Sequence, residues 1–383
     1  MKYIRIDEIT SVITGGTPST NKNEYWDNGD IPWLQSGCCQ NCDVVNANKH
    51  ITKMGYDNSS TRLMPKDTVM IALTGATAGK VGYLTFEACG NQSITGILPS
   101  DKLNQRYLFF YLVSQREKIL SDCVGGAQPH ISQGYVKNIQ VPLRSLEEQK
   151  RIADVLSSLS DAIKVGQKKL SLFDELVKAR FVEMFGDLAT NDKKWPMKNF
   201  LEFAQFDCQM TTDYEKYADY PHIGIDAIEK NTGKILSYRT VKEDGVISGK
   251  YLFSPEHIIY SKIRPNLNKV ATPDFYGVCS ADAYPILPRE NITKKEFLAA
   301  ILRSDYYLDY VSHLSTRANM PKVNRTQISG FVCPIPPIAL QEEYKTLVDD
   351  IDKSKFVESL HLAKRKNRQY NRIGFLEVNT WDM

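Results

Sequence analysis

The sequence lacks the segments that would hold a chain in a membrane or send it for secretion. It has no run of about 18 apolar residues, the length that a transmembrane helix requires. Its first residues, Met1 to Asp7, show no apolar core of a signal peptide. The chain also has no large excess of one charge, because its 48 Lys and Arg residues nearly balance its 45 Asp and Glu residues. We therefore expect a cytoplasmic chain with no membrane contact, in which any nucleic-acid binding depends on a local basic surface.

A complete set of metal ligands is also lacking. Of the eight cysteines, Cys39 and Cys42 have the C-x-x-C spacing of a zinc site, yet no second such pair and no H-x(3–5)-H pair follows. A structural zinc ion takes four protein ligands. We interpret these residues as loop cysteines in a chain of reduced thiols, and we predict no metal site.

The motifs of common enzymes are missing as well. Gly75 to Val81 resembles a phosphate-binding loop, but it is one residue shorter than G-x-x-x-x-G-K and lacks the hydroxyl residue that would hold magnesium. There is no G-x-S-x-G elbow, no Rossmann fingerprint, no H-x-x-x-H pair and no Asn-Pro-Pro-Tyr-like loop for a target adenine. We predict a non-catalytic recognition protein that binds no cofactor itself. A standalone DNA methyltransferase with an unrecognised site and a protein scaffold that does not touch DNA remain as alternatives.

One long helix is predicted from Ser145 to Phe185. Ser145 and Glu148 have the spacing of a capping box, and Gly186 stands where a left-handed residue ends a helix. Steps of four and three, the repeat of a coiled coil, connect Ile152, Leu156, Leu159, Ile163, Gly166, Leu170, Phe173, Val177, Arg180 and Met184. At 1.5 Å per residue such a helix is about 60 Å long. This length favours a spacer or platform over an ordinary amphipathic helix on a core.

The sequence repeats itself at a nearly constant offset. A shift of 189 positions places Leu63 on Leu252, Lys80 on Lys269 and Ile97 to Pro99 on Ile286 to Pro288. A shift of 190 places Leu108 on Leu298, and a shift of 192 places Pro142 on Pro334 and Gln149 on Gln341. The common order of these matches indicates a tandem duplication.

Each half therefore has the same plan, a globular head followed by a long helix. Strand-like segments such as Thr68 to Leu73 and helical ones such as Leu103 to Leu120 give both heads an α+β fold. The predicted parts are head 1 at 1–144, a central spacer helix at 145–186, head 2 at 187–336, a C-terminal spacer helix at 337–376 and a tail at 377–383. Antiparallel coiled-coil pairing of the two helices would give a pseudo-two-fold molecule.

The second helix has a less regular apolar stripe. Tyr344, Val348 and Ile351 keep the spacing of the first helix, but from Phe356 onwards the apolar residues resume one position out of phase. A shift of one residue turns the stripe by about 100°. We therefore predict that the pairing of the two helices loosens after Lys355.

Two heads on a spacer suit a long target with two parts, such as DNA, whose helical turn is about 34 Å. The candidate contacts lie in loops rich in Gly, Asn, Thr and basic residues. They are Thr17, Ser19, Trp33, Gln35, Ser36, Thr77, Lys80, Gln128 and His130 in head 1, and His222, Lys262, Arg264, Asn266, Asn268, Lys269, Arg317, Asn319, Lys322, Asn324 and Arg325 in head 2. Lys and Arg would hold phosphates, and Gln, Asn, Arg and Ser would read base edges. Ordinary surface turns remain the alternative, except that Lys80 and Lys269 share one repeat position.

The order of head, long helix, head and long helix resembles the specificity subunit of Type I restriction-modification systems. Gly15 to Ser19, Ile31 to Leu34, Ser261 to Val270, and the Pro and Gln residues that precede and begin each long helix are similar to that family too. The resemblance implies two target-recognition domains, each reading one half of a split site in double-stranded DNA. Since the two heads differ at most loop positions, we predict an asymmetric site.

The resemblance also implies partners. Two methyltransferase subunits would dock on the long helices, bind S-adenosylmethionine and methylate adenine. A restriction subunit with motor and nuclease activity, which uses ATP and Mg, would join for cleavage.

Overall fold

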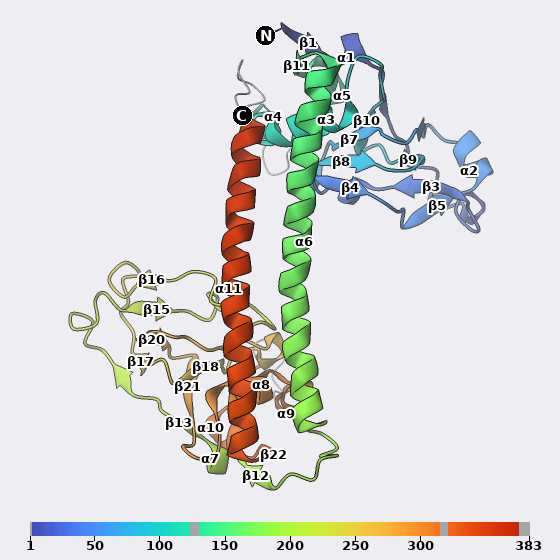
Figure 1. Ribbon diagram of the computed structural model, residues 1–383. Helices are drawn as coiled ribbons and strands as arrows, with labels where there is room; N and C mark the ends of the chain where they lie inside the picture. Colours follow the sequence, from blue (N-terminus) through green and yellow to red (C-terminus); the bar gives the residue numbers. More distant parts are fainter. Residues whose placement is uncertain (1, 123–129, 315–320, 375–383) are drawn as a thin grey trace. The chain divides into compact units, whose positions relative to one another are not determined.

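The computed structural model describes residues 2–122, 130–314 and 321–374, and it divides into two compact units (Figure 1). One unit comprises Met1–Lys168 with Ser359–Met383, and the other comprises Lys169–Glu358. Each unit contains one α+β head and a part of each long helix, α6 (Leu146–Phe185) and α11 (Ile338–Gly374). The α+β class and the tandem organisation are therefore as predicted. The predicted end of the second helix at 376 and the tail at 377–383 lie outside the described residues.

Head 1 contains two main sheets and a small one. Their strand orders are β2-β10-β7-β8-β4, β5-β3-β9-β6 and β1-β11. The strands are β1 (Lys2–Arg5), β2 (Val12–Thr14), β3 (Ile31–Leu34), β4 (Cys42–Val44), β5 (Lys49–Ile51), β6 (Leu63–Met64), β7 (Val69–Ala72), β8 (Val81–Leu84), β9 (Ala88–Gly90), β10 (Ile94–Ile97) and β11 (Gln140–Leu143). The helices are α1 (Ile6–Ile9), α2 (Lys53–Asp57), α3 (Gln105–Ser114), α4 (Arg116–Ser121) and α5 (Gln133–Asn138).

Head 2 has the same kinds of sheets. Their strand orders are β13-β21-β18-β19, β14-β17-β20-β15-β16 and β12-β22. The strands are β12 (Met197–Asn199), β13 (Ala204–Phe206), β14 (Met210–Thr211), β15 (Pro221–Ile223), β16 (Arg239–Thr240), β17 (Lys250–Phe253), β18 (Ile258–Ser261), β19 (Val270–Ala271), β20 (Gly277–Ser280), β21 (Ala283–Pro288) and β22 (Val332–Pro334). The helices are α7 (Phe200–Phe203), α8 (Lys295–Arg303), α9 (Asp305–Leu314) and α10 (Arg325–Ser329).

The predicted strand at Thr68 to Leu73 forms β7, whose four residues are all buried. Successive side chains of a strand point to opposite faces of its sheet. Val69 and Ile71 accordingly join the core beneath α3, and Met70 and Ala72 join a second core. A strand covered on both faces explains why this segment is continuously apolar.

The pairing of strands repeats the sequence duplication. Ala72 lies opposite Ile94 in head 1, and Ser261 lies opposite Ala283 in head 2, so both partners are displaced by 189 positions. The small sheets repeat as well, because β1 pairs with β11 and β12 pairs with β22. The duplication predicted from the sequence is confirmed by the shared register.

The predicted helix α6 has its expected ends and inner face. Glu148 donates its backbone N–H to the Ser145 hydroxyl at 3.2 Å, and Gly186 has a φ of +77°. All ten predicted inner positions of α6, from Ile152 to Met184, are buried or half-buried. The coiled-coil spacing therefore correctly predicted which face of α6 is buried.

The buried face of α11 does not follow the shifted apolar stripe that begins at Phe356. The buried or half-buried positions continue in steps of three and four: Gln341, Tyr344, Val348, Ile351, Lys355, Glu358, Leu362, Arg365 and Gln369. Apart from Leu362, polar residues occupy the inner face after Ile351, whereas the Phe356 side chain is 65% exposed. The heptad spacing is kept because these polar side chains find partners on α6.

Those partners show that the two helices run antiparallel within each unit. In the second unit, Lys355 lies 2.7 Å from Asp174, and Lys169 lies 3.1 Å from Glu358. In the first unit, Arg365 donates to the carbonyl of Ala162 at 3.2 Å, and Gln369 donates to Ser160 at 2.5 Å. The pairing therefore continues beyond Lys355 as a polar seam.

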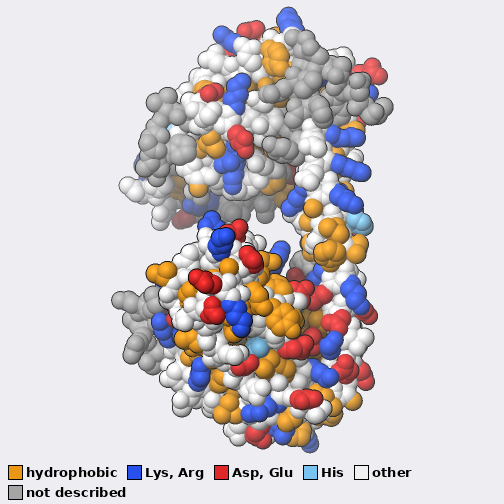
Figure 2. Space-filling model, turned by 90° about the vertical axis from the view of Figure 1, so that its left-hand side faces the viewer, with side chains coloured by type: hydrophobic (Ala, Val, Ile, Leu, Met, Phe, Trp, Pro, Cys, Tyr) orange, Lys and Arg blue, Asp and Glu red, His pale blue; other side chains and the backbone are white. Residues whose placement is uncertain are grey.

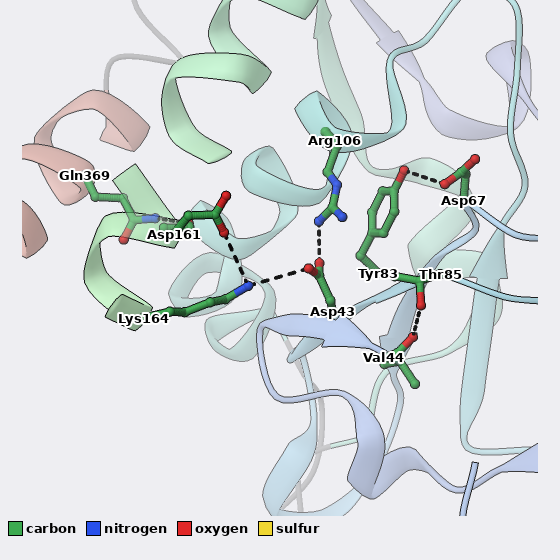
Figure 3. A network of polar contacts seen from close by, with 10 residues as sticks. Asp43, Val44, Asp67, Tyr83, Thr85, Arg106, Asp161, Lys164 and Gln369 are labelled. Carbon is green, nitrogen blue, oxygen red and sulfur yellow. Dashed lines mark hydrogen bonds and ion pairs between the residues drawn. The ribbon is translucent and has the colours of Figure 1, made fainter. Parts of the chain in front are cut away.

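Head 1 is also joined to α6 by charged side chains (Figure 3). Asp43 on β4 forms ion pairs with Arg106 on α3 and, at 3.5 Å, with Lys164 on α6. The Arg106 guanidinium lies 3.5 Å from the centre of the Tyr83 ring. Burial alone would raise the pKa of Asp43, but the Arg106 hydrogen bond and the charges of Arg106 and Lys164 lower it below its ordinary value.

Candidate nucleic-acid interface

Two loops meet at the same place in each head, and most of the predicted contacts lie there. In head 1, Thr74 forms an isolated β-bridge with His130, and Ile131 donates its N–H to the carbonyl of Leu73 at 2.8 Å. We name residues 73–80 and 130–133 the head 1 junction. Three of the predicted contacts, Thr77, Lys80 and His130, belong to this junction.

Head 2 repeats this arrangement with other side chains. Ile263 forms the matching bridge with Lys322, and Val323 donates its N–H to the carbonyl of Lys262 at 3.0 Å. We name residues 262–269 and 321–325 the head 2 junction. It contains Arg264, Asn266 and Arg325, all of which are exposed.

A short helix follows each junction and is capped by its own side chain. The Ser132 hydroxyl accepts the N–H of Tyr135 at 3.0 Å, and the Asn324 side chain accepts the N–H of Gln327 at 2.8 Å. Asn324, predicted to read bases, therefore uses its oxygen as a helix cap. Arg325, the next residue, begins the capped helix α10.

The head 2 junction assembles cations around Asp282 and Tyr284. Lys322 lies 3.5 Å and Lys262 lies 3.7 Å from the same carboxylate oxygen of Asp282. Lys262 lies 5.4 Å and the Arg325 guanidinium 5.5 Å from the centre of the Tyr284 ring. Cations at such distances are attracted by an aromatic face. Burial raises the pKa of Tyr284, so the ring supports these cations as a neutral phenol.

Three other candidate residues of head 2 are bonded within the protein itself. Lys269 donates its ammonium to the carbonyl of Ile225 at 2.8 Å. Asn268 is buried, with a φ of +48°, and donates to the carbonyl of Arg303 at 2.9 Å. The Nδ1 atom of His222 lies 2.7 Å from Asp244, and its ring is mostly covered. These three residues have structural partners in this conformation, so they rank below Arg264, Lys322 and Arg325 as DNA contacts. Lys262 also has one, because its ammonium donates to the carbonyl of Ala281 at 2.6 Å.

In head 1, two predicted contacts are held by polar side chains that the sequence analysis did not select. Lys80 donates to the side chain of Gln40 at 2.7 Å, and Thr17 donates to that of Gln92 at 2.5 Å. Both glutamines are exposed. They come from separate loops, so no local pattern could have linked them to these residues.

The glycine-rich loop of head 1 approaches its own chain rather than open solvent. A Cβ atom on Gly15 would lie 2.1 Å from the carbonyl oxygen of Gly90, and one on Gly16 would lie 2.4 Å from the Ser60 hydroxyl. Trp33 is only 3% exposed and donates its indole N–H to the carbonyl of Gly16 at 3.0 Å. Trp33 is therefore a core residue, and we remove it from the candidate contacts.

The remaining candidates fall into three groups. Ser19, Gln35 and His130 are exposed, and Ser36 and Thr77 are half-buried. Gln128, Arg317 and Asn319 lie outside the described residues.

No group of three or more His, Cys, Asp or Glu side chains is placed to hold a metal ion within the residues that the structure describes. No helix in this part of the chain is long and apolar enough to cross a membrane.

Comparison with known proteins identifies the family. The Type I restriction modification DNA specificity domain matches residues 1–172 and 192–361, and the chain belongs to this family. The Type I restriction enzyme EcoDI specificity subunit of Escherichia coli is 29% identical over 410 residues, covering 98% of this chain and 85% of that protein. The MjaIX specificity subunit of Methanocaldococcus jannaschii is 30% identical over 188 residues, 48% of this chain and 43% of that protein.

A solved structure supports the same fold. The S subunit of a Type I restriction-modification system from M. genitalium has a TM-score of 0.63 at 14% identity, and the match covers 100% of this chain and 96% of that one. The family resemblance and the fold class predicted from the sequence are thus confirmed.

Proposed function

We propose that this chain is the subunit that gives a Type I restriction-modification complex its DNA sequence specificity. The observation that carries the proposal is one backbone arrangement presented twice with different side chains. The same bridge joins Thr74 to His130 in head 1 and Ile263 to Lys322 in head 2. Two heads of one design but of unlike chemistry suit a split target whose two halves differ.

We assign a role in this function to each segment of the chain. Target-recognition domains at 1–144 and 187–336 read DNA, spacer helices at 145–186 and 337–376 separate them, and 377–383 is a tail. The chain acts in the cytoplasm and carries no catalytic group of its own. Methyltransferase subunits supply S-adenosylmethionine chemistry, and restriction subunits supply the ATP- and Mg-dependent motor and nuclease.

Exposed apolar residues on the long helices support the docking of partner subunits. Phe356, Val357 and Leu360 on α11 are 65%, 50% and 47% exposed. Figure 2 shows hydrophobic side chains gathered on the outer side of a long helix, beside a run of Lys and Arg side chains. Large exposed apolar side chains that lie together are typical of interaction surfaces.

The proposal is tested by binding experiments on the purified chain alone and on its complex with the methyltransferase subunits. We expect the isolated chain to bind no S-adenosylmethionine, whereas the complex binds it and prefers cognate over scrambled duplex DNA. Binding of S-adenosylmethionine by the isolated chain would favour a standalone methyltransferase. A complex with equal affinity for both duplexes would favour a scaffold.

A further inference from the structure

We propose that the head 2 junction is a clamp for the DNA backbone, in which Lys322 and Arg325 bind phosphate groups, and that the head 1 junction has no such clamp. Lys262, whose ammonium also donates to the carbonyl of Ala281 at 2.6 Å, adds positive charge to this clamp. The salt dependence of DNA binding would then come mainly from head 2. This inference rests on the proposed function, because it assigns the chemistry of contact to one of the two reading heads.

The positions of the cations support a phosphate site. Lys262 and Lys322 both lie within 4 Å of one oxygen of Asp282, so their ammonium groups are held close together. Arg325 lies over the rings of Tyr284 and Phe206, at 5.5 and 5.8 Å from their centres. Asp282 alone cannot neutralise three cations. A surplus of positive charge on a prearranged surface favours a polyanion such as DNA.

Exposure supports it as well. The side chains of Lys322 and Asp282 are 46% and 43% exposed, so a phosphate can reach them without any rearrangement of the core. Arg264, on the same loop, is exposed and has no carboxylate within ion-pair distance among the described residues. Its backbone N–H is bonded to the carbonyl of Pro321 at 2.8 Å, which holds the two loops of the junction together.

The internal repeat provides the comparison with head 1. The shared strand register and the shared bridge align Lys262 with Leu73, Lys322 with His130 and Arg325 with Gln133. The same register aligns Asp282 with Ser93 and Tyr284 with Thr95. At these described positions, head 1 therefore has none of the three cations, no carboxylate and no aromatic ring. Gln133 instead donates to the carbonyl of Val12 at 3.3 Å, inside its own head.

The test exchanges residues between the two repeats in the full complex with its methyltransferase subunits. The first variant combines Lys322→His and Arg325→Gln, which places the head 1 residues in head 2. Each phosphate contact contributes about 0.9 to the slope of log affinity against log salt concentration. At pH 8, where a histidine with an ordinary pKa is neutral, we expect this slope to fall by about 2. Affinity should fall for cognate and scrambled duplexes alike.

Three further variants keep the proposal falsifiable. The converse exchange, His130→Lys with Gln133→Arg, should steepen the slope by up to about 2. Asp282→Asn removes the neutralising carboxylate and should strengthen binding to any duplex, a gain that misfolding cannot mimic. Lys198→Ala removes a lysine on β12, outside the junction, and should change the slope by less than about 0.5.

The outcomes separate the inference from the proposed function. An unchanged slope in the first variant, with cognate preference retained, would overturn the clamp and leave the proposed function intact. An equal fall of the slope in Lys198→Ala would also overturn the clamp, because the effect would then reflect the net charge of the chain. If the first variant loses affinity for a methyltransferase subunit instead of for DNA, the cations serve an acidic protein surface. A wild-type complex that binds no DNA would contradict the proposed function itself.

Discussion

The side-chain oxygen of Gln149, in the first turn of α6, accepts the backbone N–H of Asn104 at 2.8 Å. Gln341, in the first turn of α11, accepts the backbone N–H of Lys294 at 2.9 Å. Both glutamines are fully buried. The side-chain NH₂ of each also donates to the carbonyl of the residue five positions earlier, at 2.9 Å. The start of each long helix is thus tied to the segment before α3 or α8 of its head by the same amide.

We predict that Gln149→Leu destabilises the chain by about 2 kcal/mol, because a backbone N–H loses its partner in the protein interior. Denaturant unfolding of the isolated chain measures this. The matched control is Gln167→Leu on the exposed side of the same helix, where the change should stay within about 0.5 kcal/mol. Equal effects of the two substitutions would show that the buried amide does not fasten the helix.

The corrected register of α11 gives a second prediction. Leu362 is 8% exposed, and Phe356 is 65% exposed. Leu362→Ala should cost about 2–3 kcal/mol of unfolding free energy, whereas Phe356→Ala should cost less than about 0.5 kcal/mol. The same unfolding assay measures both. If the Phe356 variant proved the less stable one, the apolar stripe inferred from the sequence would be the true inner face.

Phe356→Ala has a further expected effect on assembly. If α11 docks a methyltransferase subunit, the variant should retain less of that subunit in co-purification while the isolated chain keeps its stability. Lys353→Ala, an exposed residue of the same helix, serves as the control. Full retention with Phe356→Ala would remove this residue from the docking surface.

The Asp43 cluster predicts a dependence of stability on pH. The pKa of Asp43 is lower in the folded chain than in the unfolded one, so its contribution is present above the unfolded pKa, about 4. That contribution is lost as the pH falls through the folded pKa. The stability difference between the wild type and Asp43→Asn should therefore be constant from pH 7 to about 5 and shrink below about pH 4.

Urea unfolding between pH 3 and 7 measures this difference. Asp57→Asn is the control, because Asp57 forms an exposed pair with Lys53 at 2.6 Å on α2. A difference for Asp43→Asn that grows on acidification would reverse the expected sign and contradict the ion-pair account.

Local and periodic features could be predicted from the sequence. The cap at Ser145, the end at Gly186 and the inner face of α6 follow from spacing along one helix. The duplication was readable because repeated residues kept their order. The strand at β7 followed from a short apolar run.

Features that depend on distant partners could not be predicted. Lys355 and Glu358 occupy the inner face of α11 because they form ion pairs with Asp174 and Lys169 of α6. The spacing of apolar residues along α11 cannot reveal these partners on another helix. Trp33 was grouped with the polar residues Gln35 and Ser36 that follow it, yet Gly16 accepts its indole N–H inside the core. Residue type alone likewise did not separate Lys269, whose ammonium donates to the carbonyl of Ile225, from Lys322 beside Asp282.

The central claim is that two unlike heads of one chain read the two halves of one DNA site. Sequencing of methylated adenines in the genome of cells that express the chain with its methyltransferase subunits tests it most directly, against cells that lack only this chain. The account predicts methylation at one discontinuous motif, with two unlike halves separated by a gap of constant length. A continuous motif, two identical halves, or a methylation pattern unchanged by loss of the chain would contradict it.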